Sequence, residues 1–208
     1  FFIGACLAIV VFYIRRGLLE TQSFKNAQQD KNQPESSMFS LFKHYPRQAF
    51  TVLFLTAGGT VAFYTYTTYL QKYLVNTSGF SKPEATQITT LALFIFMCLQ
   101  PFAGALSDKI GRKPLMISFG VLGVLFTYFL FDKLGQTQDY WSAFWICLVG
   151  LVIVTGYTSI NAVVKAEMFP AHIRALGVAL PYALANTLFG GTAEFFALSF
   201  KEAGHESW

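Results

Sequence analysis

Charged side chains are scarce in this sequence. Aspartate, glutamate, lysine and arginine make up only 12% of its 208 residues, whereas 54% are apolar, and the mean hydropathy is +0.46. A water-soluble domain carries about 25% charged residues. Half of that share leaves too little polar surface to cover a globule, which argues against a soluble protein. We therefore expect lipid to be the solvent for much of the chain.

Cysteine and histidine are also few, and neither forms a cluster. The three cysteines lie far apart in apolar stretches, and the three histidines lie in or beside loops: Cys6, Cys98, Cys147, His44, His172 and His205. These spacings indicate neither a disulfide framework nor a metal site. Without a clustered nucleophile or a carboxylate pair, we expect no catalytic residues, no cofactor and no membrane-embedded enzyme.

Long apolar segments define the predicted fold. The first, residues 1–14, is shorter than the roughly 20 residues that a helix needs to cross about 30 Å of hydrocarbon, so we expect it to be the end of a truncated transmembrane helix. Residues 15–47 are polar and are expected to form a linker with one surface helix. Because backbone polar groups in lipid are satisfied within helices, we expect an all-α membrane protein with five further full transmembrane helices, near residues 48–71, 84–106, 115–131, 142–164 and 174–200.

The basic residues are distributed unequally between the two sets of helix ends. Eleven of the 15 lie at one set: Arg15, Arg16, Lys25, Lys31, Lys43, Arg47, Lys109, Arg112, Lys113, Lys165 and Arg174. The other four lie at the opposite set: Lys72, Lys82, Lys133 and Lys201. The positive-inside rule places the richer side in the cytoplasm. The net charge of +4 is thus a signal of membrane topology, and we expect no nucleic-acid partner.

The loop from Gly104 to Lys113 contains a motif of small and charged residues. Gly104 allows a neighbouring helix to approach closely, and Gly111 permits the left-handed conformation that a sharp turn needs. Asp108 places a carboxylate at the membrane edge, where it can meet a helix N-terminus or an arginine. The positive-inside rule alone would explain Arg112 and Lys113 but not the other three residues.

This loop resembles the signature Gly-x-x-x-Asp-Arg/Lys-x-Gly-Arg-Arg/Lys of the major facilitator superfamily and matches it at every defined position. Members of that family have twelve helices in two related halves, and the signature recurs more weakly in the second half. The resemblance implies that residues 1–14 end helix 6, that residues 15–47 are the central cytoplasmic linker, and that residues 48–208 are the C-terminal six-helix half, lacking its last helix. The N-terminal half of the same polypeptide would then be a partner of this chain.

A second motif lies between the last two predicted helices. The stretches 165–170 and 172–177 resemble the element Glu-x-x-Pro-x-x-x-Arg-x-x-Gly of the family's sugar and organic-ion porters, and Pro170 prevents the two helices from merging. The resemblance brings this motif into the same cytoplasmic layer as the first. We hypothesise that charges from both form an ion-pair cluster that closes this side in one state and parts in the other. The proposed gate residues are Gly104, Asp108, Gly111, Arg112, Glu167 and Arg174.

A closer resemblance is to the metabolite:proton symporter branch of the family. It rests on residues 64–77, 104–112, 165–170, 174–177 and 189–194. It implies a symporter that imports α-ketoglutarate or a related dicarboxylate with protons across the bacterial inner membrane, by alternating access. Carriers of citrate, of proline or betaine, and of shikimate belong to the same branch and remain alternatives. A structural or assembly membrane protein is an alternative of another class, but it explains neither motif.

The first full helix has one face rich in hydroxyl and amide groups. At 100° per residue, Thr60, Tyr64, Thr67, Thr68 and Gln71 lie within about 100° of one another. We expect this face to line the central cavity, with Tyr64, Thr68 and Gln71 as substrate ligands. The alternative is that the threonines only bond to their own backbone carbonyls. The opposite face carries three tyrosines, Tyr66, Tyr69 and Tyr73. We expect them to meet lipid or neighbouring helices, with Tyr73 in an interfacial aromatic belt.

Two asparagines in later helices are further candidate substrate ligands. Asn161 lies near Tyr157 and Ser159 in the fourth full helix, and Asn186 lies in the fifth. The alternative reading of the group around Asn161 is hydrogen bonding between helices. No arginine lies mid-membrane, and arginine is the residue best suited to bind carboxylates. We therefore expect the main cationic ligands of a dicarboxylate to come from the N-terminal half.

Glu194 is an acidic residue inside an apolar helix. An ionised carboxylate at the membrane centre costs roughly 3 kcal/mol, so we hypothesise that Glu194 takes up a proton there and couples it to transport. The alternative is that Glu194 lies near the periplasmic edge and is solvated, since Lys201 follows seven residues later. Lys72 is expected to extend to the lipid headgroups rather than to attract substrate.

Overall fold

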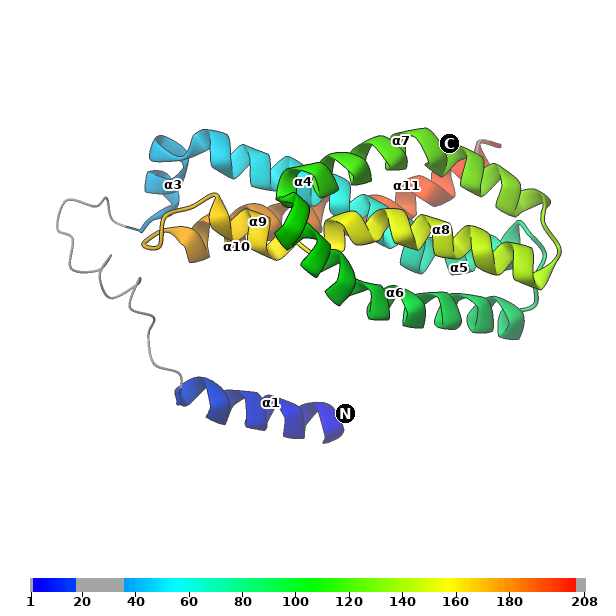
Figure 1. Cartoon of the computed structure of the whole chain (residues 1–208), viewed down its shortest axis with the longest axis horizontal. Helices are drawn as coiled ribbons and strands as arrows, with labels where there is room; N and C mark the ends of the chain where they lie inside the picture. Colours follow the sequence, from blue (N-terminus) through cyan, green and yellow to red (C-terminus); the bar gives the residue numbers. More distant parts are fainter. Residues whose placement is uncertain (1, 18–35, 205–208) are drawn as a thin grey trace.

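The structure is a computed structural model that describes residues 2–17 and 36–204 (Figure 1). This part of the chain is helical throughout its regular elements and contains no β-strand. Its helices are α1 (Phe2–Arg16), α3 (Met38–His44), α4 (Pro46–Tyr64), η1 (Thr65–Tyr69), α5 (Leu70–Asn76), α6 (Lys82–Ile110), α7 (Arg112–Gln136), α8 (Tyr140–Thr158), α9 (Asn161–Glu167), α10 (Arg174–Ala185), η2 (Asn186–Gly190) and α11 (Gly191–Glu202).

The described helices from α4 to α11 join into five long stretches, which make up the bundle (Figure 1). Four of those described are long and apolar enough to cross a membrane: Pro46–Asn76, Lys82–Ile110, Arg112–Gln136 and Tyr140–Glu167. The fifth, α10–η2–α11, is of similar length but is not among these four, and it contains Asn186 and Glu194. The all-α membrane fold predicted from the apolar segments is confirmed. Each stretch runs a few residues beyond its predicted segment, because the polar ends of the helices carry no hydropathy signal.

The polar segment before the bundle is only partly described. The helix α3 is the surface helix expected in the linker, although Leu41 packs against Phe169 and Ile173. Residues 18–35, with Lys25 and Lys31, lie outside the described residues. From Gly4 onward, every described residue of α1 is exposed. The assignment of residues 1–14 and 15–47 to a helix end and a linker stays a prediction.

Local sequence signals set several helix ends. Ser81 and Glu84 form a capping box at the start of α6, where the Ser81 N–H donates to Glu84 Oε2 at 3.0 Å. Gly111 has φ +93° and connects α6 to α7 without a longer loop, as expected for a glycine turn. The backbone N–H of Ser142 donates to Asp139 Oδ2 at 2.8 Å at the start of α8. This hydrogen bond lowers the pKa of Asp139, because it stabilises the ionised carboxylate.

The core of the bundle contains the three tyrosines that were expected to face lipid or neighbouring helices. Tyr66, Tyr69 and Tyr73 are all buried and pack around Phe131 of α7. The Tyr66 hydroxyl donates to Thr127 Oγ1 at 2.8 Å, and the Tyr73 hydroxyl donates to the Phe131 carbonyl at 2.9 Å. Neighbouring helices therefore provide their environment, and the interfacial belt proposed for Tyr73 was wrong. The phenol groups find interhelical acceptors because a buried hydroxyl without a partner is costly.

Three of the long stretches are irregular in their middle. The turns η1 and η2 are π-helical, and α8 stops at Thr158 before α9 restarts at Asn161. Pi-helical turns occur often at functional sites. The turn η2 packs closely against the end of α4, directly before η1: a Cβ added at Gly190 of η2 would lie 2.9 Å from Thr60 Cγ2 and 3.1 Å from Tyr64 Cε2. The irregular segments thus converge on one region of the bundle.

Candidate functional site

A polar pocket lies where these irregular segments meet. Its volume is about 310 Å³, and its walls come from α4, the α8–α9 break, α10 and η2. Hydroxyl and amide groups dominate its polar lining, which includes Thr60, Tyr64, Tyr157, Thr158, Asn161 and Asn186. A pocket of this size with several convergent polar groups is typical of a small-molecule site.

Hydrogen bonds fix several of these side chains. Thr60 Oγ1 donates to Asn186 Oδ1 at 2.7 Å, which joins α4 to η2. Thr158 Oγ1 donates to Gln100 Oε1 of α6 at 2.9 Å. Asn161 Nδ2 donates to the Thr158 carbonyl at 3.0 Å. The last carbonyls of a helix lack hydrogen-bond donors within the helix. The Asn161 amide therefore supplies a donor to the Thr158 carbonyl, which the break after α8 leaves without one.

Lys165 lies behind the pocket and is buried. Its Nζ donates to the Tyr157 hydroxyl at 3.0 Å and to Asn161 Oδ1 at 3.3 Å, and it lies 4.8 Å from the centre of the Tyr182 ring. Sequence reasoning missed this position and treated Lys165 as a loop cation. The signal that could have found it is the spacing of residues 157, 161 and 165, which puts all three on one helical face.

The predicted substrate ligands divide between three places. Tyr64, Asn161 and Asn186 line the polar pocket. Thr68 lines a smaller neighbouring pocket of about 120 Å³, which Tyr64 also borders. Gln71 lines a third pocket, of about 270 Å³, with Lys72 and Thr86, and its Nε2 donates to Thr86 Oγ1 of α6 at 2.9 Å. Its role as a substrate ligand stays a prediction.

The physical reason for this position of Gln71 is the π-helical turn η1. A π-helical turn inserts one extra residue, which rotates every later side chain by about 100° relative to a regular helical wheel. Gln71 follows η1 and is displaced in this way. Thr67, within η1, donates to the Phe63 carbonyl at 2.6 Å, which matches the alternative of bonding to its own backbone.

Glu194 has a cationic partner that its own helix does not reveal. Lys72 Nζ of α5 donates to Glu194 Oε1 of α11, and the two side chains are 43% and 46% exposed. Lys72 therefore pairs across the bundle, and its expected extension to the headgroups was wrong. Glu194 also lines the smaller pocket. Its role in proton coupling stays a prediction.

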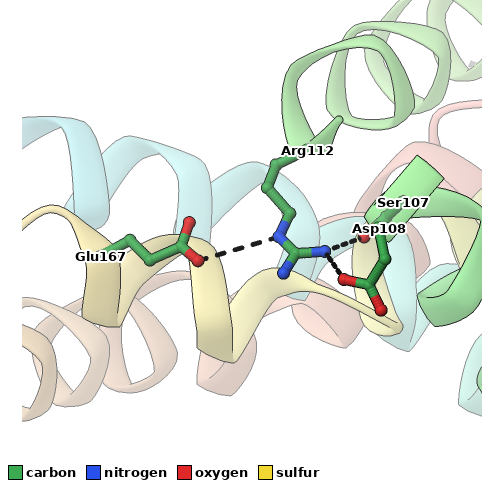
Figure 2. A network of polar contacts seen from close by, with 4 residues as sticks. All are labelled: Ser107, Asp108, Arg112 and Glu167. Atoms are coloured by element: carbon green, nitrogen blue, oxygen red, sulfur yellow. Dashed lines mark hydrogen bonds and ion pairs between the residues drawn. The ribbon is translucent and has the colours of Figure 1, made fainter. Parts of the chain in front are cut away.

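Charges from the two loop motifs meet at the other end of the bundle. Figure 2 shows Arg112 between Glu167 on one side and Ser107 and Asp108 on the other. Arg112 Nη1 donates to Asp108 Oδ1 and, at 2.5 Å, to Ser107 Oγ, while its Nε lies 3.8 Å from Glu167 Oε1. The cluster thus links the α6–α7 turn to the end of α9.

Two of the proposed gate residues lie differently from expectation. Arg174 does not join the cluster, because its Nε donates to the Phe169 carbonyl at 3.2 Å in the turn before α10. Apart from its chain neighbours and its own helix backbone, a Cβ added at Gly104 would meet no atom within 4 Å, so none of the described helices makes the close approach expected there. Whether these residues act as a gate stays a prediction.

Other reactive groups do not assemble into a site in the described ranges. There, no group of three or more histidine, cysteine, aspartate or glutamate residues could bind a metal ion. Cys6, Cys98 and Cys147 are free thiols. His172 lies beside Tyr45, with ring centres 6.1 Å apart.

Comparison with known proteins adds an independent line of evidence. The profile of the Major Facilitator Superfamily matches residues 1–193. The chain is 48% identical to the alpha-ketoglutarate permease of Escherichia coli (strain K12) over 209 residues, covering 100% of this chain and 47% of that protein. It is 27% identical to the citrate-proton symporter of Salmonella typhi over 195 residues, covering 92% of this chain and 44% of that protein.

A third relative is the inner membrane metabolite transport protein YhjE of Escherichia coli (strain K12). The identity is 25% over 201 residues, covering 95% of this chain and 46% of that protein. The chain thus spans about half the length of the curated relatives it matches. No solved structure matches the chain significantly.

Proposed function

This chain belongs to the major facilitator superfamily, and from that premise we propose that it forms part of a proton-coupled symporter. The resemblance of its loop motifs to this family is confirmed, and the chain is a multi-pass protein of the bacterial inner membrane. The proposed activity is import of α-ketoglutarate or a related dicarboxylate by alternating access, as a carrier and not as an enzyme. Its partners are the organic acid, the proton, the lipid bilayer and the N-terminal half of the same polypeptide.

The polar pocket between interrupted helices is the observation that carries this proposal. Transporters of this kind bind their substrates near the membrane midplane, at helices whose winding is broken. Here the α8–α9 break and η2 both border the pocket. Tyr64, Asn161 and Asn186 offer a hydroxyl and two amides to a polar substrate, with Thr68 in the adjoining pocket. The identity of 48% to a permease for α-ketoglutarate supports that substrate.

We assign the cytoplasmic gate to the cluster around Arg112. Alternating access requires an element with two discrete arrangements. The three ionic groups of the cluster come from two separate parts of the bundle, so relative motion of α9 and the α6–α7 turn would separate Glu167 from Arg112. Asp108, only four residues from Arg112, would keep its pairing in both arrangements.

The direct test is uptake of labelled α-ketoglutarate by cells that express the complete polypeptide. Unlabelled citrate, succinate and proline are the competitors. We expect α-ketoglutarate to compete best and a protonophore to abolish accumulation. Preferential uptake of citrate or proline would assign the protein to another substrate within the same branch, and uptake that ignores the protonophore would contradict proton coupling.

Replacing Glu194 with glutamine tests the proton-coupling role. We expect the E194Q variant to lose accumulation of substrate against a gradient, because the glutamine amide takes up no proton at physiological pH. The variant should still equilibrate substrate across the membrane. Uptake with and without a protonophore measures both properties. E202Q, on the exposed end of the same helix, is the matched control. Retained, protonophore-sensitive accumulation by E194Q would remove Glu194 from the coupling mechanism.

A Lys72→Met variant distinguishes two roles of Glu194, which are uptake of a proton and formation of the ion pair with Lys72. It removes the ion pair with Glu194 but keeps the carboxylate. If Glu194 carries the proton, K72M should still accumulate substrate. If transport instead depends on the ion pair itself, K72M and E194Q should both lose accumulation of substrate.

A further inference from the structure

Lys165 is the most deeply buried charged side chain in the described part of the protein. Only 1% of its surface is exposed, and it is the single charged residue among the buried polar residues found there. Its hydrogen-bond acceptors, the Tyr157 hydroxyl and the Asn161 amide oxygen, are both neutral. Within the described ranges, no carboxylate lies within 4.0 Å of its ammonium group. Lys165 is therefore a buried cation for which the described residues supply no counter-ion.

Such an arrangement is unfavourable without an anion. Burying an ammonium group costs several kcal/mol unless opposite charge and hydrogen bonds compensate for lost hydration. Two hydrogen bonds and the faces of the Tyr157 and Tyr182 rings, 5.3 Å and 4.8 Å from Nζ, supply part of this compensation. The nearest acidic residue in sequence, Glu167, interacts with Arg112 instead. A bound anion would supply the missing charge.

The groups that contact Lys165 also form the wall of the polar pocket. Tyr157, Asn161 and Tyr182 all line it. The Tyr157 oxygen accepts a hydrogen bond from Lys165, and the same hydroxyl also contacts Thr56. Because the Thr56 O–H already donates to the Val52 carbonyl, the Tyr157 O–H can donate either to the Thr56 oxygen or to a ligand in the pocket. Asn161 accepts from Lys165 through Oδ1 and donates one N–H to Thr158, so its second N–H remains available. A cation behind these donors strengthens their hydrogen bonds to an anion.

We propose that Lys165, together with the Tyr157 hydroxyl and the Asn161 amide, forms the binding site for one carboxylate group of the transported acid. This assignment rests on the proposed function and deepens it. It also revises the expectation that the main cationic ligands come from the N-terminal half, because one carboxylate would be bound within this chain. Lys165 acts through Tyr157 and Asn161 and is thus a positioning residue.

The test compares Lys165→Met and Lys165→Arg variants of the complete protein with the wild type. Methionine removes the charge but keeps a long side chain that packs well against aromatic rings. We expect K165M to raise the KM and the Kd for α-ketoglutarate at least about tenfold, with a much smaller change in maximal rate. K165R, which keeps the charge, should recover most of the affinity. K133M, which removes an exposed lysine from the end of α7, should behave as the wild type.

Thermal unfolding of the purified protein separates binding from a purely structural role. Replacing a buried, unpaired charge by an apolar group is often neutral or stabilising, so without ligand the Tm of K165M should be equal to or above that of the wild type. The rise in Tm that α-ketoglutarate causes in the wild type should be lost. A purely structural lysine would instead give K165M a lower Tm and an unchanged KM, and that result would overturn the assignment.

The second arm uses 2-oxopentanoate, which has the length of α-ketoglutarate but lacks its distal carboxylate. If the site formed by Lys165, Tyr157 and Asn161 binds that distal group, the wild type should prefer the diacid strongly, and K165M should bind the two acids with similar affinity. An undiminished preference for the diacid, with a weaker affinity for both acids, would place the shared carboxylate at this site instead. The assignment falls if K165M binds both acids as tightly as the wild type does.

The wild-type measurements test the proposed function separately. If the wild type binds citrate, succinate or proline instead of α-ketoglutarate, the dicarboxylate assignment is corrected, and the loss of affinity in K165M is then measured with that acid. All three competitors carry a carboxylate, so the expected loss remains the same. A wild type that binds none of these acids would overturn both proposals.

Discussion

Replacing Gly59 with alanine is expected to reduce the initial rate of substrate uptake by about tenfold or more. A Cβ added at Gly59 would lie 2.0 Å from Cζ of Tyr157 and 2.2 Å from its Cε1, far inside any permitted contact. Tyr157 is buried, and its hydroxyl is bonded to Lys165, so the ring cannot move without moving the hydroxyl. Overpacking of this kind costs about 1–3 kcal/mol, and it acts on the wall of the polar pocket.

Gly58 provides a matched control one residue away. A Cβ added there meets nothing within 4 Å, so G58A removes the same glycine flexibility from α4 without the collision. Uptake rates would be normalised to the amount of protein in the membrane, and the thermal stability of both purified variants would be compared. Equal uptake by G59A and G58A would show that the Tyr157 ring moves aside at little cost.

Replacing Arg112 with glutamine is expected to slow uptake several-fold while substrate binding is retained. The change removes the cation shared by Asp108 and Glu167 and leaves two carboxylates close together. The two carboxylates are 67% and 57% exposed, so solvent weakens both ion pairs. Because Asp108 keeps its pairing in both arrangements, only the loss of the Glu167 pair changes the balance between open and closed states, and we expect that change to be several-fold.

The measurement is initial uptake together with binding of labelled substrate to the purified protein. K113Q is the control, because it removes the exposed basic residue next to Arg112 and with it the same amount of charge. A selective loss of uptake supports a gate. If R112Q loses binding and uptake together, the cluster contributes to the folding of the bundle rather than to its opening.

Features encoded locally were predictable from the sequence. Composition and segment length predicted the membrane class and the five long helical stretches. The capping box of Ser81 and Glu84 and the turn at Gly111 depend on a few neighbouring residues, and both are present. The contact between Asp108 and Arg112 joins residues four positions apart, so it too follows from local geometry.

Features that depend on packing between distant segments were not predictable. Lys72 and Glu194 are 122 positions apart, and nothing near either residue indicates the other. The burial of Lys165 results from tertiary packing, in which Tyr182 of α10 lies against it. The position of Gln71 depends on η1, and no proline or glycine in residues 65–69 marks that π-helical turn.

The Lys72–Glu194 ion pair connects two segments that each lie directly beyond a π-helical turn. Lys72 follows η1, and Glu194 follows η2. If one of these turns rewound to regular α-helical geometry, the segment beyond it would rotate by about 100° and carry its charge away from the other. The ion pair therefore favours the π-helical form of both turns over a regular α-helical one, by the small amount that a half-exposed pair contributes.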